Sequence, residues 1–185
     1  ALQLVICHHL AEKSTSARAV LEDIIRECPE RNIVDIAKRL LEEFLNLGQE
    51  MAGDKVTDES GTVFHLPSHQ GKVVVLYFFS PAMPFAADEA RFLRRLDERL
   101  RGKDLVILGV CLHPNRKSLE QFRTTEGIGW TLFQDGKGLD GRVAKMFSVR
   151  GMPSLWVLDR KGRSRFYNIS GRDLRIAVEK LLEEK

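Results

Sequence analysis

The sequence predicts an α/β domain whose central sheet is covered by helices on both faces, together with a smaller helical segment at the N-terminal end. Two apolar runs, 72–79 and 105–111, have the length and composition of strands buried on both sides. Helical patterns alternate with apolar runs from about residue 51 onward, an order typical of helices packed on both faces of one sheet. Residues 1–50 show helical periodicity alone. We therefore predict a helical part, 1–50, and an α/β part, 51–185.

The helical part is predicted to be a hairpin of two short amphipathic helices joined at Pro29. Apolar residues recur at helical spacing over residues 17–25 and again over residues 33–45. Pro29 ends the first helix because its nitrogen carries no hydrogen for the next helical bond, and Gly48 suits the end of the second. One hairpin cannot bury both of its own apolar stripes, so we expect it to pack on the α/β part or on further sequence.

The elements of the α/β part are expected to follow one another in a regular alternation. Ser60 and Gly61 favour a turn inside a small hairpin at 57–66, and the turn 159–162 favours a second hairpin at 155–167. The other expected elements are strands at 72–79, 105–111 and 130–133, and helices at 84–101, 117–125, 139–147 and 172–182.

The composition excludes several classes of function. The chain has 185 residues, of which 43% are hydrophobic and 30% charged, as is typical of a globular protein. The formal net charge is only +3, and the basic residues of segment 91–103 are interspersed with Asp97 and Glu98, so we expect no nucleic-acid binding. No apolar run reaches the roughly 18 residues that a membrane-spanning helix needs. No signal-peptide pattern opens the chain.

The three cysteines, Cys7, Cys28 and Cys111, are widely separated and form no Cys-x-x-Cys pair. The adjacent residues Cys7, His8 and His9 lack the spacing of three or four that brings metal ligands together on a helix, so no metal site is expected. Cys28 follows an amphipathic helix, and we expect it to be a small buried hydrophobe.

The region from Phe78 to Glu89 lies between a predicted strand and the helix after it, and it contains no cysteine. About seventy residues later, Gly151-Met152-Pro153 leads into another apolar strand. With the turn at 159–162, this order of elements over about residues 57–184 resembles thioredoxin-fold proteins, and more narrowly the TlpA/ResA and AhpC/TSA types of redoxin. The resemblance implies a thioredoxin-like fold with a central mixed sheet and flanking helices. It also implies thiol–disulfide exchange as the chemistry of the family.

In that family the strand runs into Trp-Cys-x-x-Cys, and this chain departs from the pattern at all three positions. Ala82 stands in place of the Trp, Met83 in place of the first Cys and Ala86 in place of the second. Pro84 fits the first position of a helix, which would put Met83 at the helix start, where the reactive thiol of the family sits. A thioether cannot ionise and an alanine cannot resolve a mixed disulfide, so a dithiol mechanism at these positions is excluded.

Two neighbours of the lost thiols keep their places, according to the resemblance. Pro153 matches the family proline, usually cis, that faces the dithiol and leaves the backbone of the preceding residue, here Met152, open to a substrate strand. Glu89 matches a buried acid that helps to move protons during exchange in TlpA/ResA-like proteins. Without a thiol to serve, Glu89 is equally compatible with a surface position on the helix.

Cys111 is the one thiol expected near this end of the sheet. It closes a predicted strand, and His113 lies two residues later on the same face. This arrangement is compatible with an inert core thiol or with a nucleophile that has a base nearby.

Three functions remain open from the sequence. The first is a thioredoxin-like protein, related to thiol-disulfide oxidoreductases but without the cysteine pair, that serves as a non-catalytic binding or scaffold module with a protein or peptide partner at the Met83 and Pro153 surface. The second is a thiol-disulfide oxidoreductase or peroxidase-like enzyme whose cysteines were altered in this chain, or which uses Cys111. The third is a piece of a larger protein whose helical part mediates assembly. None requires a cofactor, and the resemblance alone suggests a bacterial protein located outside the cytoplasm.

Overall fold

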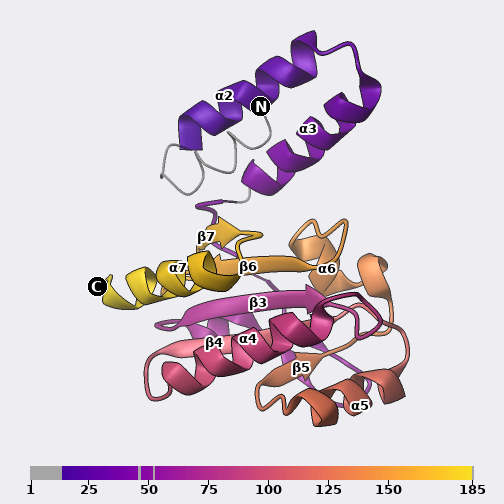
Figure 1. Ribbon diagram of the computed structural model, residues 1–185, viewed down its shortest axis with the longest axis vertical. Helices are drawn as coiled ribbons and strands as arrows, with labels where there is room; N and C mark the ends of the chain where they lie inside the picture. The colour runs from indigo at the N-terminus through magenta and orange to yellow at the C-terminus, as the bar shows by residue number, and fades with distance from the viewer. Residues whose placement is uncertain (1–13, 46, 52, 185) are drawn as a thin grey trace. The chain divides into compact units, whose positions relative to one another are not determined.

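The structure is a computed structural model that describes residues 14–45, 47–51 and 53–184 (Figure 1). The chain divides into two compact units, residues 1–49 and 50–185, each of which is treated by itself. The predictions for Cys7, His8 and His9 lie outside the described residues. None of the described helices is long and apolar enough to cross a membrane.

The first unit contains a pair of helices, α2 (Ser14–Glu27) and α3 (Arg31–Leu45), joined by a turn that includes Pro29. Leu21 on α2 and Ala37 on α3 are fully buried. Further aliphatic side chains pack around these two residues: Val20, Ile24, Ile25, Leu40 and Leu41. The two helices therefore bury part of their apolar stripes against each other.

One prediction for this unit is wrong and another stays a prediction. Gly48 has a left-handed backbone (φ 79°), as suits a glycine after a helix, but residue 46, which follows the last described residue of α3, lies outside the described residues. Cys28 is half-buried instead of buried, because it follows the last residue of α2, where the chain leaves the contact between the helices.

The second unit is built on a five-stranded mixed sheet with the strand order β5-β4-β3-β6-β7 (Figure 1). Its strands are β3 (Val73–Phe79), β4 (Leu105–Cys111), β5 (Thr131–Phe133), β6 (Ser154–Leu158) and β7 (Ser164–Tyr167). β3, β4 and β5 run parallel, whereas β6 pairs antiparallel with both β3 and β7. The predicted thioredoxin-like fold with a central mixed sheet is confirmed.

Four helices flank this sheet: α4 (Ala86–Arg99), α5 (Arg116–Glu126), α6 (Arg142–Met146) and α7 (Gly171–Glu183). The unit also contains two 3-10 turns, η1 (Leu66–His69) and η2 (Gly138–Asp140), and a hairpin of β1 (Val56–Thr57) and β2 (Val63–Phe64). The predicted helix 139–147 is two pieces, because Gly141 is extended between η2 and α6. The other predicted elements of the unit agree with the structure to within two residues at each end.

β3 is the centre of the core, and all seven of its side chains are buried. Its odd-numbered residues, from Val73 to Phe79, share one cluster with the apolar faces of α4 and α7. On the opposite face, the ring centroid of Phe78 lies 5.5 Å from that of Phe147, which in turn lies 5.6 Å from that of Trp156. Side chains of a strand alternate between faces, so packing on both faces explains why β3 is apolar throughout.

Asp58 ties the small hairpin to the rest of the unit. Its side chain has no exposed surface, and one carboxylate oxygen accepts hydrogen bonds from the backbone N–H groups of Ser60 (2.9 Å) and Thr62 (2.9 Å). The other oxygen accepts from the backbone N–H of Gln134 (3.2 Å) and from the guanidinium of Arg116 (3.3 Å). Burial acts to raise the pKa of Asp58, but hydrogen bonds from Ser60, Gln134 and Thr62 outweigh burial, and the pKa lies below its ordinary value.

Because the folded-state pKa of Asp58 is lowered, its carboxylate stabilises the fold above the unfolded-state pKa, and this contribution is lost as the pH falls through the folded-state value. We expect Asp58→Asn to lower the free energy of unfolding by about 2 kcal/mol at neutral pH and by much less in strong acid. Urea unfolding at a series of pH values measures both effects. The matched control is Asp54→Asn, since the Asp54 side chain is 85% exposed, and this change should stay within roughly 0.5 kcal/mol. Equal losses in the two variants would contradict the structural role of Asp58.

Candidate functional site

Two loops meet at the carboxyl end of β3. The first, residues 80–85, connects β3 to α4, and the second carries Met152 and Pro153 into β6. Because Phe78 pairs with Ser154 across the sheet, the strand register puts Pro153 beside the last residue of β3. The Met152–Pro153 peptide bond is cis, the isomer that the resemblance implied. Positions 83–86 and 152–153 therefore come together at one end of the sheet.

The chain enters α4 through two turns. The N–H of Met83 donates to the carbonyl of Ser80 (3.0 Å), and the N–H of Ala86 donates to the carbonyl of Met83 (3.3 Å). Phe85, the N-cap residue of α4, lies in the left-handed region (φ 66°), which non-glycine residues rarely adopt. The helix begins at Ala86, so the prediction that Pro84 takes its first position, with Met83 at the helix start, is wrong. The two turns delay the start of the helix by two residues.

The side chains at positions 83 and 86 do not supply exchange chemistry. Ala86 is 2% exposed, so its methyl group packs in the interior. Met83 is partly exposed, and its thioether sulfur has no proton to lose. These two positions therefore contribute packing and apolar surface, and no nucleophile.

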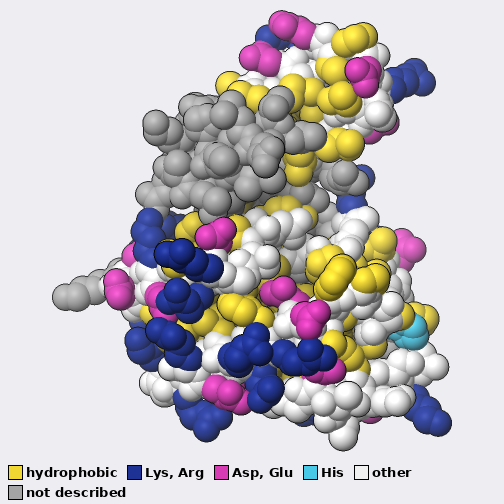
Figure 2. Space-filling view, viewed as in Figure 1, with side chains coloured by type: hydrophobic (Ala, Val, Ile, Leu, Met, Phe, Trp, Pro, Cys, Tyr) yellow, Lys and Arg dark blue, Asp and Glu magenta, His cyan; other side chains and the backbone are white. Residues whose placement is uncertain are grey.

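Apolar side chains are exposed at this end of the sheet. Phe85 is 81% exposed and Met152 is 38% exposed. Met83 is partly exposed and Pro153 is exposed. Figure 2 shows hydrophobic side chains gathered where β3 ends and α4 begins. We call Met83, Phe85, Met152 and Pro153 the apolar rim. Aromatic and methionine side chains are enriched in protein–protein interfaces relative to the rest of the surface, so the apolar rim has the composition of a contact surface.

Glu89, on the first turn of α4, is half-buried and faces a pocket of about 280 Å³ that Tyr77, Pro153, Leu155 and Asn168 also line. Burial raises the pKa of the Glu89 carboxyl. Its Oε1 atom is buried and has no hydrogen-bond partner among the described residues, and the same holds for the hydroxyl of Tyr77. The pKa of Tyr77 is also raised, first by burial and then by the charge of Glu89. The sequence left Glu89 either as a buried acid or as a surface residue of the helix. In the structure its side chain is half-buried, with one oxygen atom removed from solvent.

Cys111 ends β4 as expected, but its thiol and the imidazole of His113 form hydrogen bonds with different partners. Cys111 is 1% exposed, and its Sγ donates to the backbone carbonyl of His113 (3.9 Å). The imidazole Nδ1 of His113 instead accepts from the backbone N–H of Asn115 (3.1 Å). Burial raises the pKa of the Cys111 thiol to about 11, although the backbone of His113 and the charge of Arg116 act to lower it. At neutral pH this thiol is protonated and buried, which is the character of an inert core cysteine.

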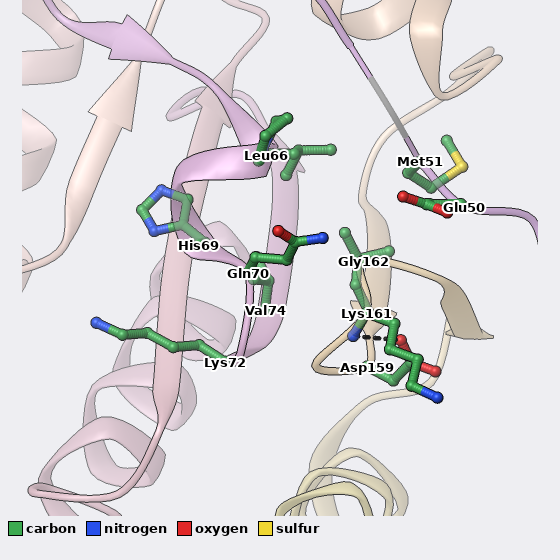
Figure 3. Close-up of a pocket in the computed structure, with 12 residues that line it drawn as sticks. Glu50, Met51, Leu66, His69, Gln70, Lys72, Val74, Asp159, Lys161 and Gly162 are labelled. Carbon is green, nitrogen blue, oxygen red and sulfur yellow. Dashed lines mark hydrogen bonds between the residues drawn. The ribbon is translucent and has the colours of Figure 1, made fainter.

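Two other hollows lie near this sheet. One, of about 300 Å³, is lined by residues that include Ala82, His113 and Phe122. The other lies near the opposite end of β3, between η1 and the turn after β6, and measures only about 50 Å³ (Figure 3). Of its two acids, Glu50 is exposed, and Asp159 accepts a hydrogen bond from the backbone N–H of Lys161 (2.9 Å) and serves the turn. Neither hollow contains a buried acid oxygen without a partner, so the pocket beside Glu89 has the most distinctive chemistry of the three.

No group of three or more His, Cys, Asp or Glu side chains that could hold a metal ion occurs within 14–45, 47–51 and 53–184. Sequence reasoning missed the part played by Tyr77, because a tyrosine in an apolar strand gives no sign that its hydroxyl lacks a partner. It also missed Asn168, which follows β7 and whose side chain accepts from the backbone N–H of Leu155 (3.1 Å).

Comparison with known proteins identifies the family. A model of the AhpC/TSA family matches residues 47–166, more than half of the chain. The chain belongs to the AhpC/TSA family. No similar sequence was found among curated proteins.

Solved structures with this AhpC/TSA-family fold include several thiol-disulfide oxidoreductases. The thioredoxin domain of one from Bacteroides vulgatus is 20% identical with a TM-score of 0.66, and the match covers 74% of this chain and 98% of that one. One from Bacteroides fragilis is 19% identical with a TM-score of 0.65, covering 72% and 99%. A secreted Mycobacterium tuberculosis disulfide oxidoreductase, homologous to E. coli DsbE, is 22% identical with a TM-score of 0.59, covering 72% and 99%. At these identities the likeness establishes the fold alone.

The burial of Cys111 predicts slow reaction with thiol reagents. In a Cys7→Ser/Cys28→Ser variant, we expect Cys111 to react with Ellman's reagent at mildly alkaline pH roughly 100-fold more slowly in the folded protein than in urea, because burial suppresses both access and thiolate formation. The rate in the folded protein should keep rising as the pH approaches the pKa of about 11. Similar rates in folded and unfolded protein would show that the thiol is accessible.

Proposed function

We propose that this AhpC/TSA-family domain is a non-catalytic binding module that holds an extended segment of a partner protein against the apolar rim. The single observation that supports this most strongly is the identity of residues 83 and 86. Thiol–disulfide exchange needs a thiolate to attack a disulfide sulfur and a second thiol to release the mixed disulfide. Met83 and Ala86 provide neither group.

The surroundings of Cys111 support the same proposal. A replacement nucleophile would need access to its substrate and a usable fraction of thiolate at neutral pH. Cys111 has 1% of its surface exposed, and burial raises its pKa to about 11. An enzyme that relies on Cys111 is therefore the less favoured alternative.

The apolar rim supports a role in binding. Phe85 is held by its backbone in a conformation that is unfavourable for a non-glycine residue, and its side chain is largely exposed. Residues in strained backbone conformations are concentrated at functional sites, so this outlier marks the loop as a candidate contact region. Met152 and Pro153 stand at the place where the family, by resemblance, offers its backbone to a substrate strand. An extended peptide that pairs there would cover the apolar rim.

The first test measures turnover. We expect the purified protein to reduce insulin disulfides and to consume hydrogen peroxide, with dithiothreitol as reductant, no faster than a heat-inactivated sample of the same protein. An active thioredoxin in the same insulin assay serves as the positive control. Turnover above the heat-inactivated sample would overturn the proposal, and loss of that turnover in Cys111→Ser would assign it to Cys111.

The second test separates binding from stability. Peptides are selected from a random library of extended sequences on the wild-type protein, and their affinities are then measured for the Phe85→Gly variant. We expect binding to weaken by at least about tenfold, since a central aromatic contact is typically worth more than 1 kcal/mol. The free energy of unfolding should rise by up to about 1 kcal/mol, because glycine relieves the left-handed backbone and the lost side chain is exposed.

The matched control for Phe85→Gly is Ile176→Ala, which removes an apolar side chain that is 47% exposed on α7. This change should leave peptide binding unaltered. Peptides that bind the Phe85→Gly variant as tightly as the wild-type protein would exclude the apolar rim as the binding surface.

A further inference from the structure

The pocket beside Glu89 is enclosed by elements that are distant in sequence. Tyr77 comes from β3, Glu89 from the first turn of α4 and Leu155 from β6. The segment 168–170, between β7 and α7, closes the remaining side. We call this space of about 280 Å³ the Tyr77–Glu89 pocket. This volume is large enough for one long side chain.

Two of the residues that line this pocket carry a buried polar atom that lacks a partner in the protein. Tyr77 is 1% exposed, and its hydroxyl forms no hydrogen bond with any described residue. The buried Oε1 atom of Glu89 likewise forms none. Buried polar atoms in folded proteins almost always have a partner, so two such atoms on residues that line one pocket call for a partner from outside the protein.

The pocket lining carries negative charge and no positive charge. Glu89 is its one charged lining residue, and the other lining side chains are polar or apolar and neutral. Arg91, the basic residue two positions after Glu89 on α4, is paired with Asp88 (2.8 Å) and with Glu126 (2.9 Å) instead. Figure 2 shows acidic side chains over the first turns of α4, with basic side chains further along this face. A ligand that complements this pocket carries positive charge.

We propose that the Tyr77–Glu89 pocket receives the ammonium group of a lysine side chain carried by the partner segment. An ammonium group offers three hydrogen-bond donors and no acceptor, and both unpartnered atoms can accept. The apolar side chains of Leu155, Ile169 and Pro153 suit the four-carbon stem of a lysine. This inference rests on the proposed function, because Pro153 belongs both to this pocket and to the apolar rim, so a segment lying on the rim can insert a side chain here.

Because Glu89 is partly buried, the ionisation of its carboxyl group should depend on the charge of the bound group. The carboxyl is held in an environment that disfavours its ionised form, and its pKa is raised. A cation bound beside this carboxyl group lowers its pKa and so favours the ionised carboxylate. Binding of the lysine head group should therefore depend strongly on the carboxylate of Glu89 and less on the hydroxyl of Tyr77.

The test uses n-butylamine, which is the lysine side chain without its backbone, as the probe. Amide chemical shifts of the full chain are followed during titration at mildly alkaline pH and constant ionic strength. A probe of this size is expected to bind with a Kd on the order of 1–10 mM. We expect saturable shifts centred on Tyr77, Glu89 and 168–170. Binding should weaken at least about tenfold in Glu89→Gln and by a smaller factor in Tyr77→Phe.

Controls separate this inference from the proposed function. Asp88→Asn alters the adjacent exposed acid, and Ile176→Ala alters an exposed apolar side chain of α7; neither should change the affinity for n-butylamine. Butyrate and n-butanol, of matched length, should not bind in the pocket. Absence of saturable binding by n-butylamine, equal binding of n-butanol or butyrate, or unchanged affinity in Glu89→Gln would each overturn the lysine pocket. None of these outcomes bears on the proposed function, which is tested separately by the peptide affinities of the Phe85→Gly variant.

Discussion

The arrangement of the second unit depends on β3 being paired along both of its edges. β3 runs parallel to β4 over seven residue pairs and antiparallel to β6 over five, and none of its side chains is exposed. These two ladders fix the carboxyl end of β3, and with it the positions of loops 80–85 and 152–153. A slip of one residue would exchange the two faces of the strand and move Tyr77 to the side of α6. The register of the central sheet therefore determines which residues come together at the site.

The absence of cysteine at positions 83 and 86 is compatible with this framework because neither position takes part in the sheet. Ala86 packs as a small interior residue at the start of α4, and Met83 belongs to the turns before it. The same loop exposes Phe85 from a left-handed backbone position, an arrangement that contributes nothing to the core. This exposed aromatic side chain supports the proposed role in recognition.

Two acids of the second unit show how environment decides the role of a carboxylate. Asp58 and Glu89 are both removed from solvent to a large extent, yet their pKa values move in opposite directions. Asp58 accepts hydrogen bonds from several backbone N–H groups and from Arg116, so its charge is stabilised and it serves the fold. Glu89 has a buried oxygen without any such donor, so its charge is available to a ligand. Residue type and burial alone do not distinguish these two cases.

The amino-acid sequence by itself determined the alternation of strands and helices and the absence of a dithiol, because hydrophobic periodicity and residue identity are local properties. It left Glu89 and Cys111 each between two interpretations, and it placed the start of α4 two residues too early. Only the tertiary structure decided these points. The burial of Cys111 depends on neighbouring strands and helices, the turns before α4 depend on where β3 ends, and the isolation of Glu89 and Tyr77 depends on segments as distant as 168–170. The free energy of a buried polar or ionisable atom is set by partners from other elements, and those partners exist only once the chain has folded.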